Sequence, residues 1–354
     1  MITNIYFSPI QNQKQFLTFQ ANPAKFAPKL ANDTLEISSK KVLPKTGVVL
    51  GGILAGLLAK TSKPEEITLN DVMISKESGD LDSYKQNVVK FLENNYSDVC
   101  KRDKSVDLIE EIKSEKSKED IDFNLQCGVS RIFDDYMGLM YDDKLNLKDR
   151  IANQEFSPEL EDLLNNKEIQ TADKMIPLIK LTSKKDTDPT VLKIKQELQQ
   201  KYGIEELLCD NNIEFAQTCR KAFQILSENN IKIPKYVIAN EQVDMFGGIT
   251  FDSSRGKEII ISLNPDNDYY YMDLKHLIIH EILHTTQPHT LAFRTKMIPE
   301  EMQETANGVS EYASDNYAHE VHCELYVKKI LEGLSPEEEK LFDYLGGDFK
   351  STKE

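Results

Sequence analysis

The segment His280-Glu281-Ile282-Leu283-His284 places two histidines four residues apart, with a glutamate directly after the first. Residues at this spacing share one face of a helix, so both imidazoles can reach one metal ion. The Glu281 carboxylate lies on the same side, where it can act on a metal-bound water. The surrounding segment is apolar on almost every side, which is typical of a helix inside a protein core.

HExxH is the spacing by which zinc hydrolases bind their metal. The 354-residue chain has only six histidines, all between positions 276 and 322, so the motif does not reflect a histidine-rich composition. We therefore expect a Zn²⁺ ion held by His280 and His284, with Glu281 as the general base. The alternative is a pair of buried core histidines that bind nothing.

A catalytic zinc ion needs a third protein ligand. In the spacing HExxHxxGxxH the glycine position falls on Gln287 and the third histidine on Thr290, so His289 is one residue out of register. Further downstream, Glu320 and Glu324 are four residues apart on a predicted helix that ends near Leu331 and that Asp315 or Asn316 can cap.

One of these two glutamates can bind the metal while the other holds a ligand histidine in place. We expect Glu320 as the metal ligand and Glu324 as the residue behind the histidine. The alternatives for the third ligand are His289, Glu324, His319 and His322.

HExxH followed by the stretch from Tyr312 to Glu324 resembles the gluzincin metallopeptidases, and specifically the catalytic domain of anthrax lethal factor and its bacterial relatives. The resemblance covers roughly residues 205 to 345. It implies a zincin fold in which Glu320 is the glutamate ligand and Tyr312 stabilises the oxyanion. The chain departs from the family pattern by one extra residue between Tyr312 and Glu320, so Tyr317 is a second candidate for the oxyanion role.

Three short strand patterns precede the motif helix, at residues 235–240, 246–252 and 257–263, with turn-rich segments between them. Strands that lead into an HExxH helix are the order expected of a zincin catalytic domain. An exposed strand of this sheet can bind a peptide in extended form, and either 246–251 or 258–263 would serve. The predicted fold class is α+β: a mainly helical chain with a C-terminal zincin-like domain built from a small sheet, the HExxH helix and the helix of Glu320.

The chain is long enough for more than one domain. We predict a poorly ordered arm over residues 1–60, a helical accessory domain over 61–185 and the metallopeptidase domain over 186–350. Ser157 and Pro158 are predicted to open a short helix that runs to Leu164. Residues 43–60 form an apolar, glycine-rich run that is short for a bilayer, so it is a candidate for membrane association, for a targeting signal or for a docking helix.

The chain has 43 Lys and Arg against 59 Asp and Glu, a net charge of −16, which argues against nucleic acid as a partner. Its five scattered cysteines are expected to be free thiols. No signal-peptide pattern opens the chain, which favours a cytoplasmic or non-classically exported protein. We therefore predict a zinc endopeptidase acting on a protein or peptide substrate. The alternatives are a degenerate zincin-fold binding module and a membrane-associated protease effector or toxin.

Overall fold

The computed structural model describes residues 67–103, 106–140, 142–266, 273–288, 290–310 and 318–349. Its centre is a four-stranded mixed sheet in the order β3-β4-β6-β5. The strands β3 (Glu206–Leu208), β4 (Tyr236–Asn240) and β6 (Gly256–Ser262) run parallel, and β5 (Gly248–Ser253) is antiparallel to β6. The strand β5 is therefore an edge strand, whereas β6 lies between β4 and β5.

Helices make up most of the described chain, so the α+β prediction with a small sheet is confirmed. In chain order they are α2 (Leu69–Ser78), α3 (Leu81–Asn95), α4 (Ser97–Cys100), α5 (Leu108–Ser114), α6 (Lys118–Met140), α7 (Leu147–Ala152), α8 (Pro158–Thr182), α9 (Pro189–Tyr202), α10 (Ile213–Glu228), α11 (Leu274–His284), α12 (Leu291–Arg294), α13 (Glu300–Val309), α14 (Ala318–Leu331) and α15 (Pro336–Leu345). A separate two-stranded pairing joins β1 (Lys101–Asp103) to β2 (Val106–Asp107).

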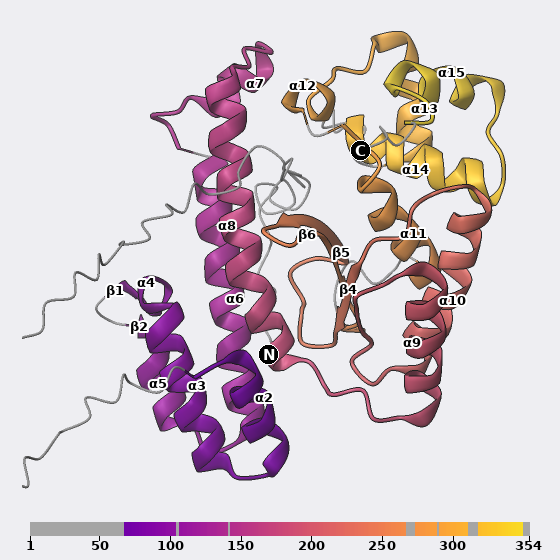
Figure 1. Ribbon diagram of the computed structural model, residues 1–354. Helices are drawn as coiled ribbons and strands as arrows, with labels where there is room; N and C mark the ends of the chain where they lie inside the picture. Colours follow the sequence, from indigo (N-terminus) through magenta and orange to yellow (C-terminus); the bar gives the residue numbers. More distant parts are fainter. Residues whose placement is uncertain are drawn as a thin grey trace, which may run out of the picture.

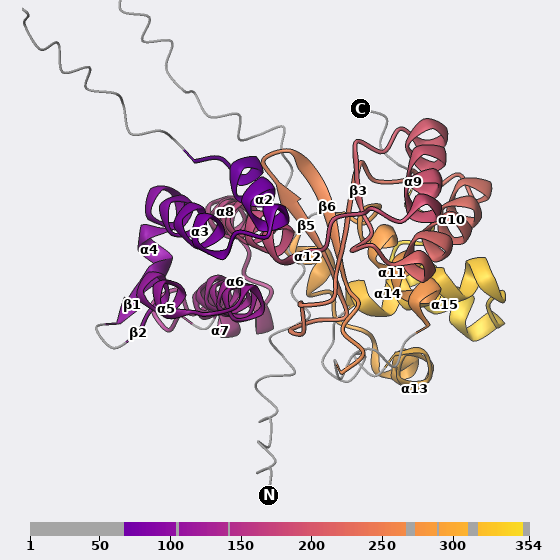
Figure 2. The same cartoon turned by 90° about the horizontal axis from the view of Figure 1, so that it is seen from below.

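The sheet lies between two helical layers, with α6 and α8 on one face and α9, α10 and α11 on the other (Figures 1 and 2). Successive side chains of a strand point to opposite faces, so each strand contributes to two cores. Ile238 and Ile260 belong to the core that includes α6 and α8, whereas Val237 and Ile259 belong to the core that includes α10 and α11.

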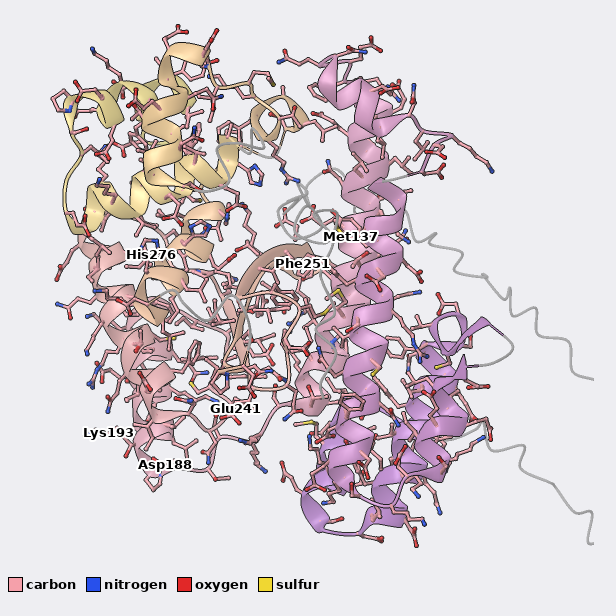
Figure 3. The ribbon with its side chains drawn as sticks, turned by 180° about the vertical axis from the view of Figure 1, so that it is seen from behind. Met137, Asp188, Lys193, Glu241, Phe251 and His276 are labelled. Carbon is pink, nitrogen blue, oxygen red and sulfur yellow. The ribbon has the colours of Figure 1, made fainter. Side chains whose placement is uncertain are left out.

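Phe251 of β5 lies in the first of these cores, together with Met137 of α6 (Figure 3). The α6 and α8 pair therefore forms one wall of the sheet. The division into domains at residues 185 and 186 stays a prediction.

The helix α8 is much longer than the sequence predicts. Ser157 caps it and Pro158 is its first residue, as expected, but it continues past Leu164 to Thr182. Its buried face includes Leu164, Thr171, Met175 and Ile179, which pack on α6 and on the sheet. This tertiary packing sustains the helix through a polar stretch, and even through Pro177, where local preference predicts an end.

The ends of α9 follow from local residues. Gly203 ends α9 in the left-handed conformation, at φ +69°, where glycine is favoured. Asp188 caps its start, and Pro189 takes the first helical position. The strand β3 was missed, since three residues are too few to show an alternating pattern.

The N-terminal predictions, including the apolar run at 43–60, lie outside the described residues. Within the described ranges, none of the helices combines the length and the apolar character needed to cross a bilayer. All five cysteines fall within those ranges and are free thiols, as predicted.

Candidate metal centre

Two packed helices, α11 and α14, provide the side chains of the site. Asp273 caps α11 by accepting a hydrogen bond from the backbone N–H of Lys275. The last two turns of α11 and the first three turns of α14 are buried on every side. The polar residues of these turns therefore face one another in a space shielded from solvent.

Three atoms converge between the two helices. The Nε2 atom of His284 lies 3.0 Å from Nε2 of His280. The Oε2 atom of Glu320 lies 3.0 Å from Nε2 of His280 and 3.4 Å from Nε2 of His284. The two histidines of α11 and Glu320 of α14 thus point at one position, although Glu320 follows His280 by 40 residues in the sequence.

Gln287 holds the His284 ring from behind. Its Oε1 atom lies 2.9 Å from Nδ1 of His284 and accepts a hydrogen bond from it. Its Nε2 atom donates to the backbone carbonyl of His319 at 2.7 Å and faces Nδ1 of His322 at 3.1 Å. His322 in turn donates from Nε2 to the carbonyl of Gly347 at 2.9 Å, and burial lowers the pKa of His322 to about 4, so this ring is neutral.

The polarity of these contacts settles the tautomer of His284. A neutral His322 that donates from Nε2 accepts on Nδ1, so the Gln287 amide nitrogen faces it and the amide oxygen faces His284. His284 therefore carries its proton on Nδ1. Its Nε2 presents a lone pair to the space between the helices.

Glu324 has the same role behind His280. Its Oε1 atom lies 2.8 Å from Nδ1 of His280, at ion-pair distance although not in linear hydrogen-bond geometry. Its Oε2 atom accepts from Nε2 of His276 at 2.8 Å. His276 lies at the more exposed end of this chain of contacts, on α11 (Figure 3). A carboxylate behind Nδ1 holds the proton there and leaves Nε2 of His280 as an acceptor.

Three acceptors that face one another at 3.0 to 3.4 Å repel unless a cation lies between them. Burial alone would lower the pKa of His280, but Glu324 and Glu320 together raise it well above its usual value. Burial would likewise raise the pKa of Glu320, but His284 and His280 hold it far below. The site is therefore built to hold positive charge, either as protons or as a metal ion.

Cys323 is a further potential metal ligand beside these residues. The side chains of His280, His284 and Cys323 can place their ligand atoms within 4.8 Å of one another, and so can those of His276, His280 and Glu324. The protein thus contains a buried cluster of histidine, cysteine and glutamate that could hold a metal ion. The Sγ atom of Cys323 lies 3.4 Å from Nδ1 of His284, on the side of the ring away from Glu320.

Glu281 lies against β5. Thr250 donates its hydroxyl to Oε2 of Glu281 at 2.9 Å and also to its backbone carbonyl. A Cβ atom on Gly248 would come within 2.6 to 2.9 Å of the Glu281 side chain, so a larger residue at this position of β5 would displace the Glu281 carboxylate. Burial raises the pKa of Glu281, although His284 and His280 partly oppose this.

The structure brings His280, His284, Glu320 and Glu324 together, with Glu281 beside them. Tyr312, its alternative Tyr317, and His289 lie outside the described residues. Sequence reasoning missed Gln287, His276, Thr250 and Gly248, which support the site. His276 lies four residues before the motif on the same helix, so helical spacing could have singled it out, whereas Gln287 lies in the turn after α11.

No protein-family model, no curated protein and no solved structure matches this chain. The side chains of the cluster are therefore the basis for assigning a function.

Proposed function

We propose that this protein is a zinc-dependent endopeptidase. The observation that carries the proposal is the convergence of His280, His284 and Glu320 on one position, with the buried carboxylate of Glu281 beside them. Two imidazole nitrogens and one carboxylate oxygen are a donor set typical of catalytic zinc.

The spacing of the three atoms fits zinc. Ligand atoms about 2.0 to 2.1 Å from a tetrahedral zinc ion lie about 3.3 Å from one another. The three separations here are 3.0, 3.0 and 3.4 Å. Three protein ligands leave one position of the tetrahedron open, as a catalytic site requires.

Glu320 is a better third ligand than Cys323. The Glu320 oxygen faces the Nε2 atoms of both histidines, whereas the Cys323 sulfur faces Nδ1 of His284, which Gln287 already occupies. Burial also raises the pKa of the Cys323 thiol well above its usual value, and the thiolate is the form that binds metal. Cys323 therefore packs behind the ligand ring.

When bound, a zinc ion would polarise a peptide carbonyl and make a water molecule more acidic. In this proposal Glu281 takes the proton from that water and delivers it to the leaving amine. Its raised pKa brings it closer to neutral pH, where such a proton shuttle works best. Thr250 and the bare backbone at Gly248 hold the carboxylate in place.

The edge strand β5 lies beside the proposed general base. It pairs with β6 on one side and directly contacts Glu281 through Gly248 and Thr250. Of its residues only Gly248 is partly exposed and the others are buried, so β5 is not the exposed strand that the sequence predicted for peptide binding. The interior position of β6 rules out the alternative segment 258–263 for this role. The oxyanion role of Tyr312 or Tyr317 stays a prediction.

The test is the zinc content of the purified full-length chain, together with its cleavage of casein. We expect about one zinc per chain in the wild type, a clear loss in Glu320→Ala, and retained zinc without cleavage in Glu281→Gln. Glu332→Ala, an exposed glutamate just beyond α14, is the matched control and should behave like the wild type.

Three results would contradict parts of this proposal. Turnover in Glu281→Gln would refute the general base, and full zinc content in Glu320→Ala would move the third ligand to Cys323 or another neighbour. A wild-type protein that binds zinc and cleaves nothing would be a binding module.

A further inference from the structure

His322 lies behind the metal centre and has a partner at each ring nitrogen. Its Nδ1 atom lies 3.1 Å from Nε2 of Gln287, and its Nε2 atom lies 2.9 Å from the carbonyl oxygen of Gly347. A neutral imidazole has one N–H and one lone pair, so these two contacts use both nitrogens. The side chain is fully buried, and water does not compete for either contact.

The orientation of the Gln287 amide is fixed by a backbone group. Its Nε2 atom lies 2.7 Å from the carbonyl oxygen of His319, which can only accept, so the amide nitrogen must lie on this side. The second N–H of this nitrogen has Nδ1 of His322 and the sulfur of Cys323 before it, each at 3.1 Å. A ring lone pair is a stronger acceptor than a thiol, so His322 is the better partner.

The turn after α15 holds the His322 ring on its other side. Gly347 adopts φ +61°, and its N–H donates to the carbonyl of Phe342 at 2.8 Å, which fixes the local backbone. The His322 ring stacks on Phe342 with centroids 5.1 Å apart, and it contacts the Phe349 ring at 4.7 Å. Because the Gly347 carbonyl can only accept, it keeps the ring proton on Nε2 and the lone pair on Nδ1.

The partner behind a metal-bound histidine orients its ring, and loss of such a partner costs roughly 10- to 100-fold in metal affinity. Gln287 is that partner for His284. The lone pair of His322 holds the second amide N–H, and so it opposes rotation of the amide that would turn its nitrogen towards His284. We propose that His322 is a positioning residue that orients the metal ligand His284 through Gln287.

This proposal rests on the proposed zinc site, and its test separates the two. Leu and Asn have similar shapes, but only the Asn oxygen, which is attached to Cγ like Nδ1 of histidine, can accept from Gln287. We would measure the Kd of zinc for wild type, His322→Asn and His322→Leu by competition with a chromophoric chelator. Urea unfolding of the chelated proteins would be measured on the same preparations.

We expect His322→Leu to bind zinc roughly 10- to 100-fold more weakly than the wild type, and His322→Asn to stay close to it. The stability of the chelated proteins should have the opposite order, because an apolar Leu suits the surroundings of Phe342 and Phe349 better than an amide. A residue that only filled space would give zinc affinities that follow stability.

A double variant tests whether His322 acts through Gln287. Gln287→Met keeps the length of the side chain and removes the amide, so it should weaken zinc binding at least as much as His322→Leu. Gln287→Met combined with His322→Leu should then bind zinc no more weakly than Gln287→Met alone. If circular dichroism shows that His322→Leu does not fold, His322→Phe replaces it in both experiments, because Phe fills the space of the ring and has no acceptor.

Equal zinc affinity in His322→Asn and in the variant without an acceptor would overturn this proposal alone. Additive losses in the double variant would also overturn it, because His322 would then act by another route. A wild-type chain that does not bind zinc would overturn the proposed function, and this proposal with it.

Discussion

Two clusters of charged side chains are buried in this protein, and they differ in where their positive charge comes from. In one, Glu168 of α8 pairs with Arg294 of α12, near Asp252 of β5, so the chain supplies the cation. In the other, His280, His284 and Glu320 direct lone pairs at one another. The contacts of Gln287 and Glu324 hold the ring protons on the Nδ1 atoms of the two histidines, away from these lone pairs.

The difference separates two kinds of buried ionic site by whether a side chain of the protein supplies the cation. In the first cluster the guanidinium of Arg294 lies 3.9 Å from the Glu168 carboxylate, and this contact joins the helix α8 to the segment after the HExxH helix. The second cluster has no such cationic side chain and could hold a metal ion from solution. Burial of three converging acceptors costs free energy unless they share a cation.

Removal of zinc should have the largest effect on stability. A ligand that binds only the folded state stabilises it by about 5 kcal/mol when its free concentration is ten thousand times Kd. We therefore expect chelated protein to unfold at clearly lower urea concentration than the zinc-loaded protein. His284→Ala should be insensitive to chelator, and equal stability of the wild type with and without zinc would remove the contrast between the clusters.

Arg294→Met should lower the free energy of unfolding by nearly as much, because it removes a cation that the chain itself supplies. It leaves the fully buried Glu168 carboxylate without its cation, and breaking a buried pair from one side costs about 3 to 5 kcal/mol. The double variant Glu168→Leu with Arg294→Met should recover most of the loss, while its dependence on zinc stays that of the wild type. Urea unfolding of the three proteins measures both effects, and a harmless Arg294→Met would show that the pair contributes little.

Asp252→Asn should have the smallest effect, visible only as a dependence on pH. Burial raises the pKa of Asp252 from 3.8 to about 6, so between these values the folded protein keeps a proton that the unfolded chain has lost. The contribution of this carboxyl is full below pH 4 and is lost as the pH rises through about 6, a change of about 3 kcal/mol. The stability of wild type minus variant, measured by urea unfolding from pH 4 to 7, should fall by this amount. A flat difference would show that Asp252 is not desolvated as the structure indicates.

Much of this protein could be predicted from local sequence patterns. The apolar run around His280 and His284 predicted a buried helix, the three strand patterns predicted β4, β5 and β6, and Ser157 marked a helix start. The i, i+4 spacing of Glu320 and Glu324 predicted that both lie on one helix face. Such features depend on residues within one or two turns of each other, so the order of amino acids alone determines them.

Only the tertiary structure decided which atoms meet. The length of α8 depends on its packing against the sheet, and the edge position of β5 depends on how four strands are ordered. The contact of His319 with the Arg294 carbonyl, and the fit of Glu281 against Gly248, join segments more than 20 residues apart. No local preference encodes such contacts, because they form only when the two cores pack and fix the helices relative to the sheet.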